Sequence, residues 1–356
     1  MSVEARAFFL DAVREPLVER ALDLGEPALG EVIVEVLACG LCHTDLGFAD
    51  GSVPPKHPLP LVLGHEAVGK VVAAGPGDGI GAEAWLGKTV IVPAVLPCGA
   101  CDLCATGRGN ACTAQKMPGN DIHGGFATHM RVPAGPLVDV SDAPAGFDVR
   151  LLSVVADAVS TAWQAVIRSE LRAGDVAFVI GVGGVGGFVA QIAHALGARV
   201  VAMDVSAARL EGMAEFGADL GILVGDAHPK EVRREAHGFA RSQGIGSGRF
   251  RIFECSGTTA GQQLAWTMLS RAATMVQVGY TPKPVELRFS NLMAFDATVH
   301  GTWGCPPEAY GDVLRLIYAG QVALEPFCAF ASMKDVNVLL ADMAAHKLDK
   351  RMVMTP

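Results

Sequence analysis

The sequence predicts an α/β protein of two domains, the first rich in β-strands and the second built on a doubly wound parallel sheet. Three observations lead to this prediction. The chain has 356 residues, which is more than one hydrophobic core usually serves. Short β-branched segments broken by glycine and proline fill residues 1 to about 150, a pattern typical of β domains. From about residue 153 onward, strand-like and helix-like segments alternate, as they do around a parallel sheet.

The first domain is expected to be a barrel-like β structure. Apolar runs rich in valine and other strand-forming residues occupy 30–40, 67–75 and 87–95. Turn-forming residues separate these runs, so each is predicted to be a strand.

The second domain shows the rhythm of a sheet covered by helices on both faces. The pattern predicts a helix over 159–170, a buried strand over 175–180, a helix over 186–198 and a strand over 199–204. Further strands are expected within 218–225, 250–257 and 272–280, and amphipathic helices at 310–320 and 333–345.

Composition excludes several classes of partner. The formal net charge of −9 provides no basic surface for nucleic acid or for an anionic membrane. No segment reaches the roughly 18 apolar residues of a membrane span, and no secretory signal pattern follows Met1. Nine cysteines, an odd number without a secretion signal, favour metal ligands over disulfides. We therefore expect a cytoplasmic protein without a nucleic-acid or membrane partner.

A glycine motif gives the strongest cofactor signal. Gly181, Gly183 and Gly186 form G-x-G-x-x-G between a predicted strand and a predicted helix. The first glycine allows a tight turn, the second lets the backbone approach a pyrophosphate, and the third packs helix against strand. Asp204 ends the next strand, where a carboxylate accepts hydrogen bonds from ribose hydroxyls. The pattern indicates dinucleotide binding, and a glycine-rich structural turn is the alternative.

Four cysteines are spaced as metal ligands. Cys98, Cys101, Cys104 and Cys112 follow the pattern C-x2-C-x2-C-x7-C. Four thiolates make a closed tetrahedral zinc site, which stabilises a loop and does no chemistry. Gly99, Gly107 and Gly109 suit the turns of such a loop. An iron–sulfur cluster or free buried thiols are the alternatives.

A second set of metal ligands is dispersed in the sequence. Cys42 lies in CGLCHTDLG and His65 in VLGHEAVG, and together they supply two of the three ligands that a catalytic zinc needs. Asp157, in an apolar stretch before a helix, is a candidate for the third, because an unpartnered buried carboxylate is costly. Aspartate is also a frequent helix N-cap, and the spacing alone leaves both interpretations open.

These motifs together resemble those of the zinc-dependent medium-chain dehydrogenase/reductase family, the alcohol dehydrogenase group. The resemblance covers nearly the whole chain, through CGLCHTDLG, GHEAVG, the four-cysteine loop, STAWQ, GVGGVG and VGY. It implies a GroES-like β-barrel catalytic domain at 1–158 and 302–356, and a Rossmann NAD-binding domain at 159–301. Position 157 is usually cysteine in the family, so Asp157 departs from the commonest pattern.

The resemblance also implies roles for individual residues. Cys42, His65 and Asp157 would hold a catalytic zinc, and the four cysteines a structural one, giving two Zn²⁺ per chain. Thr44 would relay the alcohol proton, Asp45 would brace His65, and Glu66 would lie beside the metal. Gly47 replaces a histidine that completes the proton relay in many relatives. Contacts to NAD are implied for His43, Thr161, Gly181, Gly183, Gly184, Val185, Gly186, Asp204, Arg209, Val278 and Arg351, with His43 and Arg351 at the pyrophosphate.

The implied activity is NAD-dependent oxidation of a secondary, cyclic alcohol to a ketone by hydride transfer. A specific substrate is suggested by the wording of the metal loops: 6-hydroxycyclohex-1-ene-1-carbonyl-CoA, an intermediate of aromatic degradation, oxidised to its 6-oxo product. Lys56, Arg108 and Arg131 are candidate cations for a CoA thioester. The alternatives are a secondary alcohol dehydrogenase without a CoA substrate, a zinc-free enone or quinone reductase, and a zinc-stabilised redox sensor. A homo-oligomer, dimer or tetramer, is expected.

Overall fold

The computed structural model describes residues 4–76, 81–225 and 227–356, and the chain divides into two compact units. The first unit runs through Asp157 and takes in Gly304–Gly311 and Leu324–Pro356, while the second comprises Ala158–Trp303 and Asp312–Ala323. The domain ranges proposed from the sequence, 1–158 with 302–356 and 159–301, stay a prediction. They differ from the two units mainly in assigning Asp312–Ala323 to the first domain.

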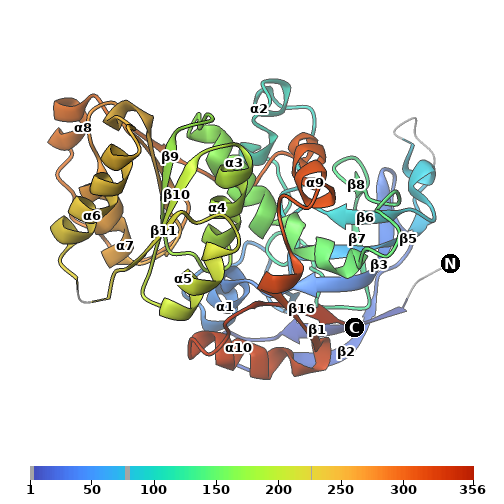
Figure 1. Cartoon of the computed structure of the whole chain (residues 1–356). Helices are drawn as coiled ribbons and strands as arrows, with labels where there is room; N and C mark the ends of the chain where they lie inside the picture. Colours follow the sequence, from blue (N-terminus) through green and yellow to red (C-terminus); the bar gives the residue numbers. More distant parts are fainter. Residues whose placement is uncertain (1–3, 77–80, 226) are drawn as a thin grey trace. The chain divides into compact units, whose positions relative to one another are not determined.

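The first unit is built on two sheets (Figure 1). Its strands are β1 (Glu4–Leu10), β2 (Val18–Asp23), β3 (Glu31–Gly40), β4 (Leu61–Val62), β5 (Glu66–Ala74), β6 (Thr89–Val92), β7 (His129–Pro133), β8 (Val138–Asp139), β15 (Cys328–Ser332) and β16 (Arg351–Thr355). One sheet has the order β2-β1-β4, and the other has the order β15-β16-β3-β5-β6-β8, with β7 also paired to β3. The predicted β-rich first domain is confirmed.

Strand β3 is the centre of the larger sheet. One edge of β3 pairs with β5 along its whole length, whereas its other edge pairs with β7 at Glu31–Glu35 and with β16 at Cys39 and Gly40. Ladder irregularities near Ile33 and Val36 let the strand bend between these partners. Strand β3 ends at Gly40, two residues before Cys42.

Several short helices complete the first unit. These are α1 (His43–Asp50), η1 (Ala82–Trp85), α2 (Asp102–Ala105), η2 (Gly109–Ala111), η3 (Val149–Ala156), η5 (Pro307–Ala309), η6 (Glu325–Phe327), η7 (Met333–Asp335) and α10 (Val336–Ala344). Helix α10 buries Val336, Leu339, Leu340 and Met343 in the same hydrophobic core as β1, β3 and β5.

The second unit is a six-stranded parallel sheet. Its strands are β9 (Val176–Ile180), β10 (Arg199–Asp204), β11 (Leu220–Leu223), β12 (Phe250–Glu254), β13 (Thr274–Gln277) and β14 (Thr298–Gly301), in the order β11-β10-β9-β12-β13-β14. The direction of progression reverses between β9 and β12, which is the point where ligands bind at the carboxyl ends of such sheets. The predicted doubly wound sheet is confirmed.

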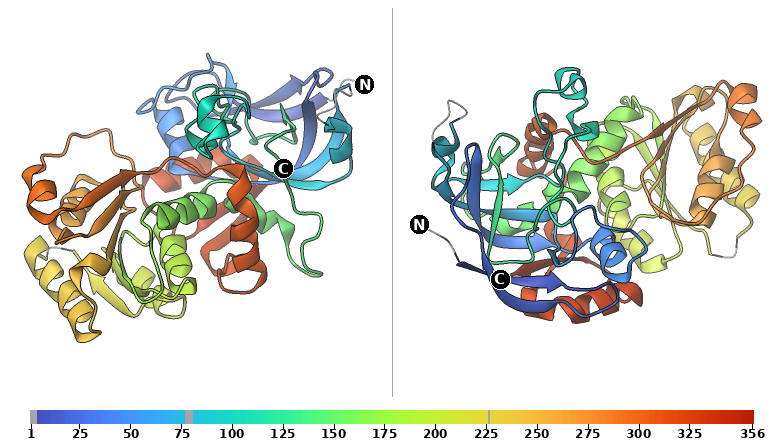
Figure 2. Two further views of the ribbon diagram at one scale, coloured as in Figure 1. Left: turned by 90° about the horizontal axis from the view of Figure 1, so that it is seen from above. Right: turned by 180° about the vertical axis from the view of Figure 1, so that it is seen from behind.

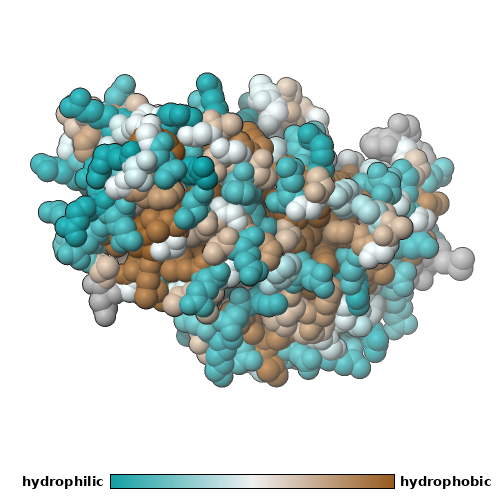
Figure 3. All heavy atoms as spheres, in the orientation of Figure 1, coloured by the Kyte–Doolittle hydropathy of each residue, from teal (hydrophilic) through white to brown (hydrophobic). Residues whose placement is uncertain are grey.

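Helices flank this sheet on both faces (Figures 1 and 2). Helices α3 (Ala158–Arg168), α4 (Gly186–Ala195) and α5 (Ala207–Ala214) lie on one face, and α6 (Pro229–Ser242) and α7 (Thr259–Met268) on the other. Two more helices, α8 (Ser290–Phe295) and η4 (Ser247–Arg249), precede strands β14 and β12, and α9 (Tyr310–Tyr318) follows the sheet. Hydrophilic residues gather over α6 (Figure 3), whose Lys230, Arg234 and Glu235 are exposed.

Two parts of the fold differ from the sequence prediction. The segment after about residue 300 was expected to form helices only, yet it also contributes β15 and β16, which extend the larger sheet of the first unit. The CGLCHTDLG segment, for which no helix was predicted, forms helix α1 from His43 onward, with Cys42 at its N-cap. Among the described residues, no helix is long and apolar enough to cross a membrane.

Candidate active site and metal centres

The glycine turn after β9 has the geometry that the motif requires. Gly181 has φ +81°, and a Cβ there would lie 2.7 Å from the backbone of Ser256. A Cβ on Gly186 would overlap the carbonyl oxygen of Gly181, so α4 can start only with glycine at this position. A Cβ on Gly183 would meet nothing closer than the Arg209 guanidinium at 3.8 Å. Only the second glycine therefore faces open space, as a turn that admits a pyrophosphate needs.

Asp204 is tied to the glycine turn. Its Oδ2 accepts a hydrogen bond from the Val182 N–H at 2.8 Å, and its Oδ1 accepts one from the Ser206 N–H at 2.9 Å. The guanidinium of Arg209 lies 3.7 Å from the same carboxylate. Asp204, at the end of β10, therefore holds the glycine turn in place through these hydrogen bonds. Its negative charge lies next to the turn.

The four cysteines converge in the loop around α2 and η2. Their sulfur atoms are separated by 3.5 Å (Cys101–Cys104 and Cys112–Cys98), 3.7 Å (Cys101–Cys112) and 4.0 Å (Cys98–Cys104). Thiolates about 2.3 Å from a tetrahedral zinc would be about 3.8 Å apart. Backbone N–H groups of Ala100 and Cys101 lower the pKa of the Cys98 thiol to about 6, which favours the thiolate that binds metal.

The turns of this loop use two of the three predicted glycines. Gly99 and Gly107 have φ near +74° with open space at the Cβ position. Gly109 has no positive φ and instead lies against Pro97.

A second cluster forms where β3 and η3 end and β5 begins. Cys42, His65, Glu66 and Asp157 each offer a ligand atom, and these atoms all lie within 4.8 Å of one another. Asp157 Oδ2 is 3.5 Å from His65 Nε2 and 3.8 Å from Cys42 Sγ. Ligands of one tetrahedral zinc would be separated by about 3.3 Å (N and O) and 3.5 Å (S and O), so the spacing fits a metal of that size.

Asp45 organises this cluster from behind. Its Oδ2 accepts from the Cys42 N–H at 2.9 Å, and its Oδ1 accepts from the Gly64 N–H at 3.1 Å. The same Oδ1 lies 3.2 Å from His65 Nδ1. Since a carboxylate only accepts, Nδ1 carries a proton, and in the neutral imidazole Nε2 therefore keeps the lone pair that can bind a metal. Asp45 is fully buried, so its position is fixed.

His65 Nε2 provides a direct test of whether a metal fits. The atom is buried and makes no hydrogen bond in the described part of the chain. Burial lowers the pKa of the His65 imidazole, but Asp45, Asp157 and Cys42 outweigh burial and hold that pKa well above its usual value. The surroundings therefore stabilise a positive charge at this point. A divalent cation shared by Nε2, the thiolate and the carboxylate satisfies the orphaned lone pair and this demand together.

Asp157 stands between two helices. It is the residue after η3, with φ −136° and ψ −65°, and α3 begins at Ala158. Position alone would suit either a helix end or a ligand. The folded structure brings Asp157 close to Cys42 and His65. The sequence could not indicate this proximity, because more than 90 residues separate Asp157 from each of them.

Glu66 and Arg351 form a buried ion pair beside the cluster. Arg351 Nε donates to Glu66 Oε2 at 2.8 Å, and the Arg351 terminal nitrogen bonds to Oε1. Burial raises the pKa of the Glu66 carboxyl, an effect that Arg351 opposes. Arg351 was expected at a pyrophosphate, but in the structure its guanidinium is 6% exposed and engaged by Glu66. The role of Arg351 toward a cofactor stays a prediction.

The hydroxyl of Thr44 lies next to the second cluster. Thr44 Oγ1 is 3.7 Å from Cys42 Sγ in the first turn of α1. Gly47, on the next turn, carries no relay side chain, and a Cβ there would lie 3.1 Å from a methyl group of Val53, so a larger residue would require Val53 to shift slightly.

The remaining predicted cofactor residues lie on separate elements. His43 is exposed at the start of α1, and Thr161 is half-buried on α3. Val278 follows β13 and donates its N–H to the Glu254 carbonyl at 2.9 Å. Gly184 and Val185 complete the glycine turn, and α4 begins at Gly186 with Val185 at its N-cap.

Sequence reasoning missed Glu254, a fully buried carboxylate at the end of β12. It accepts hydrogen bonds from the Ser256 N–H at 2.9 Å and from Gln277 Nε2 at 2.7 Å. The signal was present, because an acid ends a predicted strand at the point where the sheet reverses its progression.

Two of the three candidate cations for a CoA thioester are already paired. Lys56 Nζ lies 3.3 Å from Asp121, and Arg131 Nε lies 3.4 Å from Glu31. Arg131 also donates to the Leu24 carbonyl at 3.0 Å. Arg108 is exposed beside η2.

Comparisons with known proteins agree with this geometry. Residues 28–142 match the alcohol dehydrogenase GroES-like domain, and residues 184–319 match the zinc-binding dehydrogenase domain. An alcohol dehydrogenase of Geobacillus stearothermophilus is 29% identical over 94% of this chain and 96% of its own. A 2-dehydro-3-deoxy-L-galactonate 5-dehydrogenase of Pseudoalteromonas atlantica is 29% identical over 89% of each chain. The structure of a cobalt- and zinc-bound alcohol dehydrogenase from Pyrobaculum aerophilum is 25% identical, with a TM-score of 0.83 over 99% of this chain and 100% of its own.

The chain therefore belongs to the zinc-dependent alcohol dehydrogenase family of medium-chain dehydrogenases/reductases. The expected family, with its GroES-like and Rossmann folds, is confirmed, and the protein is an oxidoreductase of the alcohol dehydrogenase type.

Proposed function

We propose that the protein oxidises a secondary alcohol to a ketone, using two zinc ions per chain and NAD. One observation carries the proposal. The buried Nε2 of His65, without a hydrogen-bond partner among the described residues, faces a thiol and a carboxylate beside the Thr44 hydroxyl. A structural site would have no use for a hydroxyl at an open metal position.

Cys42, His65 and Asp157 would hold the catalytic metal, and Cys98, Cys101, Cys104 and Cys112 the structural one. Zinc supplies the Lewis acidity that lowers the pKa of an alcohol, and NAD supplies the hydride acceptor. A thiolate, a neutral imidazole and a carboxylate neutralise Zn²⁺ as well as the commoner set of two thiolates and one imidazole.

The residues around the cluster divide the remaining work. Thr44 would take the alcohol proton at Oγ1, since it is the hydroxyl next to Cys42 Sγ. Asp45 would hold the His65 imidazole in the tautomer that binds metal. Glu66, balanced by Arg351, would lie beside the metal without adding net charge.

The proposed cofactor is NAD, with NADP excluded by charge. Asp204 lies at the glycine turn, where its carboxylate would repel a 2′-phosphate, and Arg209 is 3.7 Å away. His43, Thr161, Val278 and Arg351 are proposed as further contacts. The specificity constant should favour NAD by about ten- to a hundredfold, or 1.4 kcal/mol per tenfold. Asp204→Ala should shrink this gap and Arg209→Gln should widen it; equal rates with both cofactors in the unaltered enzyme would refute the assignment.

The substrate is proposed to be a cyclic secondary alcohol, with the 6-hydroxycyclohexene-carbonyl thioester of CoA as the most specific candidate. The pairing of Lys56 and Arg131 with carboxylates leaves fewer cations for CoA phosphates than the sequence suggested. A sugar acid is the second candidate, because one of the relatives is named for that activity.

Metal analysis and a substrate screen together test the function. We expect about two zinc ions per chain and NADH production from secondary alcohols. A redox sensor would contain one zinc and give no NADH, and a zinc-free reductase would contain none and consume NADPH or NADH with enones. Cyclic alcohols, their CoA thioesters and aldonic acids form the three arms of the screen. A homo-oligomer and a cytoplasmic location stay predictions.

A further inference from the structure

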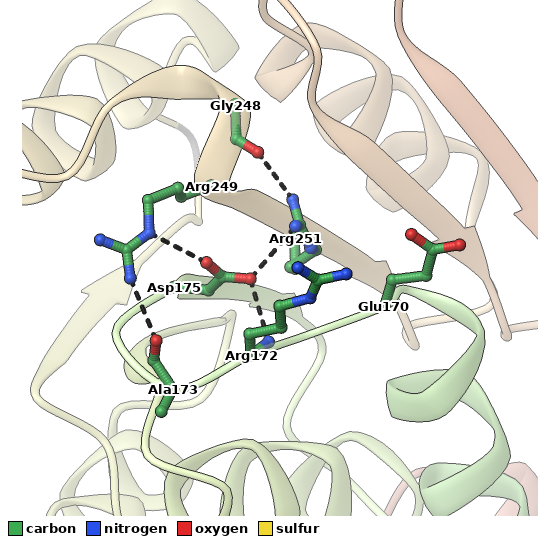
Figure 4. A pocket seen from close by; sticks show the side chains of 7 residues that line it. All are labelled: Glu170, Arg172, Ala173, Asp175, Gly248, Arg249 and Arg251. Atoms are coloured by element: carbon green, nitrogen blue, oxygen red, sulfur yellow. Dashed lines mark hydrogen bonds and ion pairs between the residues drawn. The ribbon is translucent and has the colours of Figure 1, made fainter.

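Three arginines gather at the opposite end of the sheet from the glycine turn. Arg172 lies in the loop that leads to β9, Arg249 ends η4, and Arg251 lies on β12. Together with Glu170, Ala173, Asp175 and Gly248 they line a hollow of about 320 Å³ (Figure 4). We call these residues the arginine hollow. In a chain with 37 acidic and 28 basic residues, three clustered guanidiniums are a local reversal of charge.

A single buried carboxylate, Asp175, accounts for only part of this positive charge. Arg249 Nε lies 3.1 Å from Oδ1, and an Arg251 terminal nitrogen lies 3.2 Å from Oδ2. The Arg172 backbone N–H also donates to Oδ2 at 3.0 Å. Asp175 is 4% exposed and is enclosed by these donors. Its single negative charge is shared by two guanidiniums, so it neutralises only one of their two positive charges.

Two donor groups of the arginine hollow have no protein partner among the described residues, whereas an Arg249 terminal nitrogen donates to the Ala173 carbonyl at 3.1 Å. Among the residues that the structure describes, the Arg172 guanidinium makes neither a hydrogen bond nor an ion pair, and Arg251 Nε is buried without a partner. Arg251 is held in place because it also donates to the carbonyls of Gly248 and Phe250 at 3.0 and 3.2 Å. Glu170 adds one acid to the rim, which leaves three guanidiniums against two carboxylates.

The chemistry of these donors selects the ligand. Guanidiniums bind phosphate oxygens in pairs, more strongly than they bind a single-point acceptor, and Asp175 holds two of the three, Arg249 and Arg251, in place. The volume lies at the lower end of small-molecule sites, which suits a phosphate group carried by a small molecule. We propose that the arginine hollow is a binding site for a phosphate group, separate from the dinucleotide site.

The position in the sheet supports separation of the two sites. β9 runs from Val176 to Ile180, and β12 runs from Phe250 to Glu254. Both strands begin at the arginine hollow and end at the glycine turn and Ser256. Five residues of strand span roughly 17 Å, too far for the pyrophosphate of a dinucleotide at the glycine turn to reach the hollow.

Calorimetric titration of the full-length, zinc-loaded enzyme tests the proposal. Inorganic phosphate and glycerol 3-phosphate are the probes, chloride at equal ionic strength is the reference, and each titration is run with and without saturating NADH. We expect both probes to bind in both conditions. Arg172→Gln should weaken binding about tenfold, because this guanidinium has no internal contact to lose. The matched control, Arg234→Gln on the exposed face of α6, should leave binding unchanged.

The comparison of the two probes also shows whether the ligand is a phosphate ester or free phosphate, and some outcomes would contradict the proposal. Tighter binding of glycerol 3-phosphate supports a phosphate ester, and equal binding supports free phosphate. Heats no larger than those of chloride, equal weakening in Arg172→Gln and Arg234→Gln, or loss of binding with NADH would each overturn the proposal. Arg249→Gln serves as a second variant, since Arg251→Gln removes a buried donor and could fail to fold. None of these outcomes depends on which alcohol the enzyme oxidises.

Discussion

The two ligand clusters of the first unit use similar atoms in opposite ways. The four-cysteine cluster takes all its ligands from residues 98–112, in a loop where Cys98 is exposed. The cluster of Cys42, His65 and Asp157 joins residues up to 115 positions apart and is largely buried. The first cluster consists of four identical thiols that are close together in the sequence. The second combines a thiol, an imidazole and a carboxylate from segments that are far apart in the sequence. A closed set of four like ligands suits a structural metal, whereas a mixed set of three leaves a position for chemistry.

The largest effect should come from Asp157, the proposed ligand that lies farthest along the chain from Cys42. Asp157→Asn and Asp157→Ala should lower zinc from about two to about one per chain and reduce turnover by roughly a thousandfold or more, because two protein ligands hold a catalytic zinc poorly. Metal analysis and NADH production measure the two effects.

Asp148→Asn provides the control for Asp157. Asp148 caps η3 by accepting from the Arg150 N–H at 3.0 Å, and it lies outside both clusters. This variant should keep both metals and full turnover. If Asp157→Asn behaves in the same way, with stability lowered by about 1 kcal/mol or less, Asp157 is only a helix cap and the contrast between the clusters fails.

The hydroxyl beside one cluster gives the next effect. Thr44→Val keeps the size of the side chain and removes its proton acceptor, so kcat should fall by about a hundred- to ten-thousandfold. Both zinc ions should remain. Thr44→Ser restores the hydroxyl and should recover most of the rate, which a purely structural role of Thr44 would not require. A valine variant with unaltered kcat would remove Thr44 from the mechanism.

A smaller effect is expected from Asp45, which contacts the His65 imidazole on the side away from the proposed metal. Asp45→Asn weakens the bond that holds His65 Nδ1, so the affinity of the second cluster for zinc should fall by about ten- to a hundredfold. A chelator titration should therefore release one zinc more readily and leave the other unchanged. Equal loss from both clusters would show that the substitution acts through general unfolding.

Activity per molecule should change least at the four-cysteine loop. Cys101→Ser replaces a thiolate with a poor zinc ligand, so the loop should lose its metal and the yield of folded protein should drop. Turnover per folded molecule should change by less than about fivefold, since a closed site does no chemistry. Cys328→Ser removes a thiol that lies outside both clusters and should retain two zinc ions. Normal folding of Cys101→Ser with two zinc ions retained would contradict the assignment.

Sequence reasoning succeeded where neighbouring residues determine the geometry. The glycine motif predicted the turn because Gly181 must adopt a positive φ and Gly186 must admit the Gly181 carbonyl. The spacing of Cys98 to Cys112 likewise predicted that the four sulfur atoms converge, and they lie within 4.8 Å of one another, because a loop of this length folds around one point. The alternation of strands and helices predicted the parallel sheet for the same reason, because the hydrophobic period of each strand and helix depends only on nearby residues.

Long-range pairings were beyond reach of the sequence pattern. The ion pair of Glu66 with Arg351 joins residues 285 positions apart, and neither residue signals its partner. The C-terminal strands β15 and β16 were missed because the pairing of β16 with β3, and of β15 with β16, adds no sequence period of its own. The arginine hollow depends on two loops that meet only when β9 and β12 pair side by side.

The sequence by itself determined the fold class, the glycine turn and the four-cysteine loop, because each is built from residues close together in the chain. Only the tertiary structure brought the Asp157 carboxylate beside Cys42 and His65, and its role as a metal ligand stays a prediction. Its carboxylate lies 3.5 Å from His65 Nε2 because β3, β5 and η3 bring three distant chain segments to one point. Backbone propensity acts over a few residues, whereas a mixed metal site requires packing to overcome the entropy of joining segments far apart in the chain.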